Sequence, residues 1–260
     1  MSILVIIIFI VFPFVSLPFI LLGIAFDKKH SKIYGILLAF ILAIIAYNFV
    51  PKVEHDLYRY YLEMQAYYSK INFFNFLSDN NIAKAIFKLL QFIFAKIGNF
   101  NLLPFFCTFI GYNITFWIIL DYSKLKEIKS SVTISIIIAF ICSFYHINFM
   151  SGLAQYLAIS IAFLGFYLEY VKENKSNLVK ILYVLPVTIH ISTIMFLAFR
   201  ILLCFKWNKI RIVYFMFLVS YIFLPSIFYQ ILNIIPGMKI ISEKIQFYML
   251  SGNNKLVRNI

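Results

Sequence analysis

Charged residues and cysteines are both scarce in this chain. Only 13% of its 260 residues are charged, whereas 63% are hydrophobic, and the mean hydropathy is +0.92. A water-soluble domain of this length has too little interior to bury so much apolar surface. The three cysteines lie far apart in apolar stretches, which excludes a disulfide framework and zinc-ligand spacing. The sequence therefore predicts an all-α, polytopic membrane protein.

Motifs of the common soluble enzyme classes are missing as well. The chain contains no Walker loop, no Gly-x-Ser-x-Gly and no His-Glu-x-x-His, so no cofactor and no metal are expected. The net charge of +13 does not indicate nucleic-acid binding, because the lysines form short clusters between apolar runs, as in cytoplasmic loops of membrane proteins. These clusters are Lys28, Lys29 and Lys32; Lys124, Lys126 and Lys129; and Lys172, Lys175 and Lys180.

Apolar runs about as long as a hydrocarbon core of about 30 Å recur along the chain. The first run lacks the basic start and the short apolar centre of a signal peptide, so it predicts a retained span. Segment 82–97 carries Lys84, Lys88 and Lys96 at helical spacing, which predicts an amphipathic helix in the membrane interface. We expect one membrane domain, residues 1–260, with seven to eight membrane segments. The runs are 3–26, 33–50, 102–120, 132–149, 152–171, 178–204 and 212–235.

Loop charge predicts the orientation of these segments. With the lysine clusters in the cytoplasm, loop 51–81 lies outside. The run 178–204 conflicts with this pattern as a single span, because the basic residues at 206–211 would then face outward. The run also contains Pro186 and a polar group around His190. We therefore expect a broken helix near His190, with both halves returning to the cytoplasmic side.

The densest polar segment of the chain runs from Glu54 to Glu63 in the outer loop. On a helix, Arg59 can pair with Asp56 three residues before it or with Glu63 four residues after it. A guanidinium matches the oxygens of a diphosphate, and Asp56 would orient or deprotonate a sugar hydroxyl. The alternative is an amphipathic interfacial helix with a surface ion pair. The same segment supplies His55, Tyr60 and Tyr61 as candidate substrate-binding residues.

Ionisable groups inside apolar runs are further candidates, because they are costly in a membrane. His190 is either a catalytic base or a structural hydrogen-bonding group. Arg200 either binds phosphate or extends to the cytoplasmic interface. Gln155 is a weaker candidate for substrate binding, as are His146 and Asn148 at a predicted outer turn.

The order of these features resembles the EpsG/Wzy-type polysaccharide polymerase family, over about residues 30–205. In that family the span starting near 153 usually opens with Arg-Gln and a Leu-Ala pair; Gln155 fits, whereas Ala154 stands where the arginine is expected. Relatives also continue with further spans, so the polar tail at 236–260 is expected to be an early end. The similar segments are Asp56-Leu-Tyr-Arg-Tyr-Tyr61, 82–97, Leu153 to Phe163, and Ile189-His-Ile-Ser192.

The resemblance implies a multi-pass protein of the bacterial inner membrane that builds O-antigen, capsule or exopolysaccharide. It would transfer a glycan from undecaprenyl diphosphate to a hydroxyl of the next lipid-linked unit, with Asp56 or His190 as base and Arg59, aided by Arg200, on the leaving diphosphate. Its ligands would be lipid-linked oligosaccharide and membrane lipids, and its partners flippase and chain-length regulator proteins. Two alternatives stay open: a flippase or permease for lipid-linked glycans, and a non-catalytic, truncated assembly subunit.

Overall fold

The computed structural model describes residues 2–78, 84–143, 152–203 and 212–213. Every element in these ranges is helical, as the all-α prediction requires. The chain divides into two compact units, Met1–Ala198 and Phe199–Ile260, and all packing reported below lies within the first. The predicted tail at 236–260, the turn with His146 and Asn148, and nearly all of the predicted run 212–235 lie outside the described residues.

The predicted span at 3–26 is two short helices, and the prediction of one span was wrong. α1 covers Ser2–Val11 and α2 covers Leu17–Phe26, with Pro13 in the turn between them. Proline lacks an N–H and clashes with the preceding helical turn, so Pro13 disfavours a continuous helix here. Each helix has ten residues and is about 15 Å long, which is about half of a hydrocarbon core.

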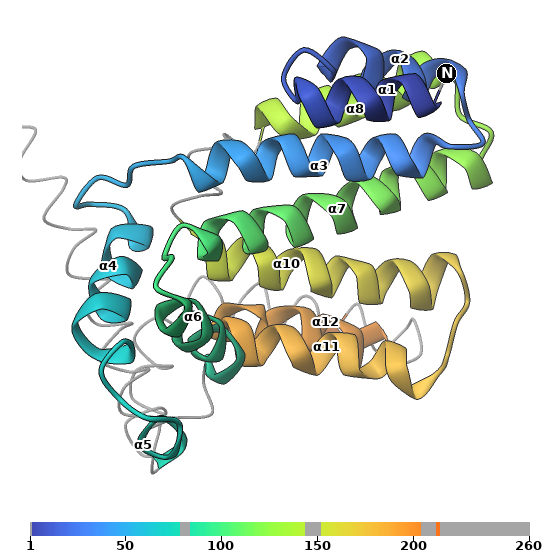
Figure 1. Ribbon diagram of the computed structural model, residues 1–260. Helices are drawn as coiled ribbons and strands as arrows, with labels where there is room; N and C mark the ends of the chain where they lie inside the picture. The colour runs from blue at the N-terminus through green and yellow to red at the C-terminus, as the bar shows by residue number, and fades with distance from the viewer. Residues whose placement is uncertain (1, 79–83, 144–151, 204–211, 214–260) are drawn as a thin grey trace, which may run out of the picture. The chain divides into compact units, whose positions relative to one another are not determined.

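The apolar helices lie side by side in layers (Figure 1). The helix α3 packs against α7, α7 against α10 and α10 against α11, while α2 contacts α3 and α8. By length and composition, two described helices can span a membrane: α7, and α10 with the π-helical turn η2 that continues it. The predicted number of seven to eight segments stays a prediction. The bounds are α3 Ser31–Tyr47, α7 Leu102–Leu125, α8 Ser130–Ser143, α10 Leu153–Phe166, η2 Tyr167–Val171 and α11 Asn177–Ile189.

Small residues at four-residue spacing allow these helices to approach closely. On α3, Gly35 faces α7, and a Cβ atom there would lie 2.8 Å from Leu120 Cδ1. Small residues spaced in this way are typical of helix interfaces in membranes, where close backbone packing replaces the hydrophobic effect. The fully buried members of the two stripes are Ala39 and Ala43 on α3, and Ala154, Ala158 and Ala162 on α10.

A second group of helices lies at the α4 end of the first unit. The helix α4 covers Asp56–Glu63 and continues through the π-helical turn η1, Met64–Tyr68. After α5, Phe73–Ser78, the helix α6, Ala85–Ile97, runs crosswise to α3, α7 and α10 (Figure 1).

The helix α6 is amphipathic, as predicted for segment 82–97. It buries Phe87, Phe92 and Phe94, whereas Lys96 is exposed. Lys84 precedes the helix in the left-handed conformation (φ 67°), so it does not continue the lysine face. The position of α6 in a membrane interface stays a prediction.

The run 178–204 is broken at His190, as predicted. His190 has extended backbone angles (φ −150°, ψ 119°) and is followed by the 3₁₀ turn Ile191–Thr193 and by α12, Ile194–Leu203. The ring of Phe166 on α10 lies 5.0 Å from Tyr183 of α11 and 6.3 Å from Phe196 of α12. On one straight helix, residues 183 and 196 would be about 20 Å apart. The chain therefore reverses at His190.

Candidate functional site

The ion pairs predicted for segment 54–63 are present on α4. Arg59 Nη2 lies 3.1 Å from Asp56 Oδ1, and Arg59 Nε lies 3.9 Å from Glu63 Oε1. Both spacings, three and four residues, place the groups on one helix face. About half of each side chain is exposed. Arg59 is thus held by both carboxylates at once, and the triad carries one net negative charge.

Two tyrosines anchor α4 to neighbouring helices. Tyr60 is 3% exposed and its ring meets Phe87 of α6 edge-to-face at 4.9 Å. Burial, together with the nearby Asp56 carboxylate, raises the pKa of Tyr60 to about 12, so its phenol stays protonated at neutral pH. The Tyr61 hydroxyl donates to Asn101 Oδ1 at 2.9 Å, directly before α7 begins. These contacts fix the helix; the predicted substrate-binding role of both tyrosines stays a prediction.

The His55 side chain already makes two contacts in the turn that precedes α4. Its ring stacks on Phe49 at 5.6 Å with an interplanar angle of 19°. The backbone N–H of Lys52 donates to His55 Nδ1 at 3.2 Å, which requires that this ring nitrogen carry no proton. Substrate binding by His55 stays a prediction, and only Nε2 would be suited to it in this arrangement.

Gln91 is a site residue that the sequence analysis missed. Its side chain is 1% exposed on α6, and Nε2 donates to Glu63 Oε2 at 3.1 Å. Glu63 therefore has Arg59 on one oxygen and Gln91 on the other. The signal in the sequence was a polar side chain between Leu90 and Phe92, because a polar group that becomes buried among apolar residues needs a partner.

His190 occupies the break between α11 and α12. Its Nδ1 lies 2.7 Å from Ser192 Oγ, and its carbonyl accepts a hydrogen bond from the Thr193 hydroxyl at 2.7 Å. Thr188 donates back to the Leu185 carbonyl at 2.8 Å. The hydroxyl groups around His190 thus stabilise a chain reversal that leaves the imidazole half-exposed.

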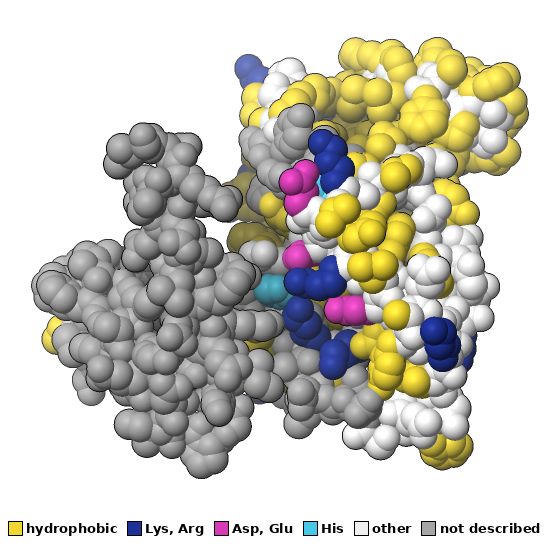
Figure 2. Space-filling model, turned by 90° about the vertical axis from the view of Figure 1, so that its left-hand side faces the viewer, with side chains coloured by type: hydrophobic (Ala, Val, Ile, Leu, Met, Phe, Trp, Pro, Cys, Tyr) yellow, Lys and Arg dark blue, Asp and Glu magenta, His cyan; other side chains and the backbone are white. Residues whose placement is uncertain are grey.

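The helix α6 connects the α4 triad with the break at His190. It contacts η1, which continues α4, and it also contacts α11. Figure 2 looks onto this end: acidic and basic side chains gather near the centre of the described surface, with a histidine among them. The two predicted parts of the site therefore lie at the same end of the first unit. The shared aqueous pocket stays a prediction.

Two other candidates have different surroundings. Gln155 is exposed in the first turn of α10, next to Ala154, which is fully buried. An arginine at 154, as the resemblance led us to expect, would interrupt the stripe of small residues on this helix. Arg200 lies half-buried on α12, in the second unit. Substrate binding by Gln155 and Arg200 stays a prediction.

The opposite end of the first unit contains a polar cluster centred on Asp121, which the sequence analysis did not identify. Asp121 is 8% exposed on α7 and lies 2.6 Å from Lys32 Nζ of α3. Its other oxygen lies 2.6 Å from Lys172 Nζ and accepts a hydrogen bond from Tyr167 at 2.6 Å. Lys32 also lies 4.8 Å over the ring of Trp117. The contacts bring two of the lysine clusters together; the predicted cytoplasmic orientation of these clusters stays a prediction.

These features define a helical membrane protein with an ionised surface segment at one end and lysine clusters at the other. The family model for the EpsG family matches residues 32–260. The chain belongs to the EpsG family, which points to a role in polysaccharide biosynthesis. The match continues past residue 205, where the resemblance was expected to end. No curated protein and no solved structure matches the chain.

Proposed function

We propose that this protein polymerises polysaccharide repeat units linked to undecaprenyl diphosphate at the outer face of the bacterial inner membrane. The hydroxyl oxygen of one lipid-linked unit would attack the anomeric carbon of the growing glycan. The bond from that carbon to the diphosphate breaks, and undecaprenyl diphosphate leaves. Asp56, with His190 as the alternative, accepts the hydroxyl proton.

The observation that supports this proposal is the position of Arg59 between two carboxylates, at the end that also contains the reversal at His190. This transfer needs a cation for the leaving diphosphate and a base for the hydroxyl proton, and the base can be a carboxylate or an imidazole. They lie on the end opposite the lysine clusters, which is the outer end if basic loops are cytoplasmic.

The net negative charge of the triad sets a condition on substrate binding. A diphosphate cannot bind Arg59 favourably while both carboxylates remain in place. The longer contact, 3.9 Å to Glu63, is the one that would open, because Gln91 continues to bind Glu63 through its other oxygen. Asp56, 3.1 Å from Arg59, then stays near the reacting centre as base.

The test is complementation of a deletion strain, with surface glycan length as the measurement. Asp56→Asn and Arg59→Gln should reduce long chains and retain single repeat units, because each removes a group worth about 10²-fold or more in rate. Glu54→Gln is the matched control, since it removes one exposed carboxylate from the same loop outside α4. Normal length in Asp56→Asn and Arg59→Gln at wild-type protein levels would exclude this site.

The deletion itself separates the alternative functions. If the deletion strain retains single repeat units on its surface, the protein is a polymerase. If the strain loses all surface glycan, the protein is a flippase or permease. Unchanged glycan in the deletion strain indicates a non-catalytic subunit.

The Glu63→Gln variant is expected to remain active at low substrate concentration and to bind the lipid-linked unit more tightly, because the substitution removes one of the two carboxylates that compete for Arg59.

A further inference from the structure

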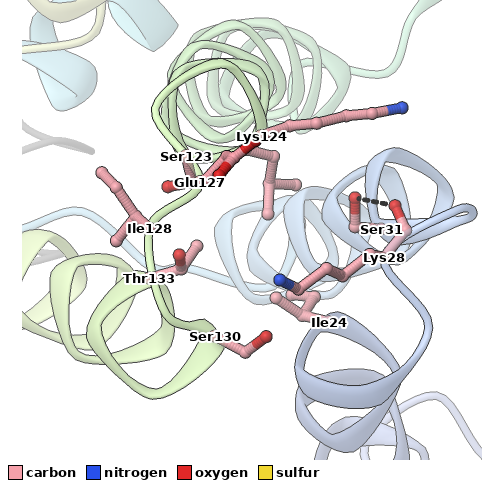
Figure 3. Close-up of a pocket in the computed structure, with 10 residues that line it drawn as sticks. Ile24, Lys28, Ser31, Ser123, Lys124, Glu127, Ile128, Ser130 and Thr133 are labelled. Carbon is pink, nitrogen blue, oxygen red and sulfur yellow. Dashed lines mark hydrogen bonds between the residues drawn. The ribbon is translucent and has the colours of Figure 1, made fainter.

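A cavity of about 450 Å³ lies at the lysine end of the first unit, between α2, α3, α7 and α8. This volume is within the range of about 300–1,000 Å³ typical of small-ligand sites. In Figure 3, Lys28 extends into the cavity from the turn between α2 and α3, and Ser130 and Thr133 of α8 lie across from it. The cavity is at the end opposite α4, so it does not belong to the proposed catalytic site.

The lining of the cavity suits a phosphate group. Lys28 supplies a cation, and Lys124 is an exposed lysine at the rim that points away from the centre (Figure 3). Hydroxyl groups line the same cavity, and α3 and α8 both begin at the cavity wall, where helices carry partial positive charge. Glu127 is the one acidic lining residue, so the formal charge of the lining is +1. The lining hydroxyls are Ser31, Ser123, Ser130 and Thr133.

The surface beside the cavity is strongly apolar. Phe26, two residues before Lys28, is 77% exposed, and Leu125, next to Lys124, is 48% exposed. On α8, Val132 and Ile136 beside and beyond Thr133 are 46% and 40% exposed. A polar, cationic cavity with apolar side chains at its edge fits a ligand that has a phosphate head and hydrocarbon chains.

We propose that this cavity binds the headgroup of an anionic glycerophospholipid. Lys28 contacts the phosphate, the Ser123 and Ser130 hydroxyls donate to the phosphate and glycerol oxygens, and the acyl chains lie along α2 and α8. The Ser31 and Thr133 hydroxyls already donate to backbone carbonyls. Basic cavities between helices on the cytoplasmic side commonly hold such headgroups. The Glu127 carboxylate repels the phosphate and lowers the affinity for the lipid, whereas the Lys28 ammonium attracts the phosphate and raises that affinity.

The test is native mass spectrometry of the full-length protein in detergent, titrated with phosphatidylglycerol and, separately, with zwitterionic phosphatidylcholine. Phosphatidylglycerol should bind at least tenfold more tightly. Lys28→Gln should weaken its binding about fivefold, as removal of one basic residue near a phosphate does. Glu127→Gln should strengthen it by a similar factor. Lys126→Gln is the matched control, because it removes a lysine next to Glu127, in the turn between α7 and α8 but outside the cavity lining, and should leave binding unchanged.

Each other outcome overturns the proposal. Equal binding of the two lipids, or a Lys126→Gln effect as large as that of Lys28→Gln, would indicate only a general attraction to basic loops. Shifts of the same sign in Lys28→Gln and Glu127→Gln would exclude a charge-based site. Glycerol 1-phosphate supplies the second arm: if it competes fully at micromolar concentration, the ligand is a soluble phosphate and the lipid assignment is wrong.

Discussion

Asp121 on α7 lies 2.6 Å from Lys32 Nζ on α3, which is 89 positions away in the sequence. The same carboxylate contacts Lys172, which follows the π-helical turn after α10. One side chain thus ties three central helices together at their lysine end. Because each partner is charged, these hydrogen bonds are stronger than neutral ones.

Asp121→Asn should destabilise the protein by about 2 kcal/mol, because the amide cannot compensate two lysines beside a largely buried position. The thermal midpoint in detergent should fall by several degrees. Glu173→Gln, a loss of one exposed carboxylate next to Lys172, should leave the midpoint unchanged. Equal midpoints for both variants would show that the Asp121 cluster adds no stability.

The reversal at His190 predicts which introduced cysteines can be labelled from outside the cell. In a variant without the native cysteines, Glu54→Cys and Ser192→Cys should react with an impermeant maleimide added to intact cells. Lys126→Cys and Glu173→Cys should react only after the membrane is permeabilised. If Glu54→Cys and Ser192→Cys react from opposite sides, the proposed active site is excluded.

Gly23→Ala should lower the thermal stability by about 1–3 kcal/mol, as overpacking of a buried contact does. A Cβ at residue 23 would lie 2.6 Å from the ring of Tyr34, which is fully buried and donates to Asp27 at 3.2 Å. A ring held in this way cannot move without losing that hydrogen bond. Gly165→Ala is the control, since its nearest atom would be Leu182 Cβ at 3.3 Å; a loss as large as that of Gly23→Ala would contradict this account.

Two substitutions of Glu127 separate the effect of backbone conformation on stability from the effect of charge. It has φ 51° where α7 ends, and the Ile128 N–H reaches back to the Ser123 carbonyl. Because a non-glycine residue pays for the left-handed conformation, Glu127→Gly should raise the stability by about 1 kcal/mol. Glu127→Ala removes the same carboxylate and should give no gain. Equal thermal midpoints for the two variants would refute the conformational explanation.

Much of the fold could be predicted from apolar runs and loop charge. The start of α7, the end of α6 and the break at His190 follow from hydropathy, Pro186 and the excess charge at 206–211. The split between α1 and α2 was not predicted, because hydrophobicity is continuous across Pro13. Packing partners depend on which small residues face which helix, and hydropathy does not report that.

The ion pairs of the α4 site were predictable because Asp56, Arg59 and Glu63 are close in sequence. Gln91 and Asp121 were not identified, because their partners are 28 and at least 46 residues away. Contacts of that kind arise only when helices are assembled, so single-sequence periodicity does not contain them. In the sequence, Ala154 departs from the family pattern. In the structure it is fully buried in the stripe of small residues on α10, which gives it a packing role.

The π-helical turn after α10 accommodates one extra residue beside the Asp121 cluster. Tyr167 and Lys172 are five residues apart, and the Lys172 N–H donates to the Tyr167 carbonyl. On a regular α-helix the two side chains would diverge by about 140° around the axis, yet both reach one carboxylate here. Deleting a single residue between them would leave the two side chains four residues apart, about 40° around the axis of a regular α-helix. A one-residue deletion at 168–171 would therefore keep both groups on one helix face, and the Asp121 contacts that join α10 to α3 and α7 should be retained.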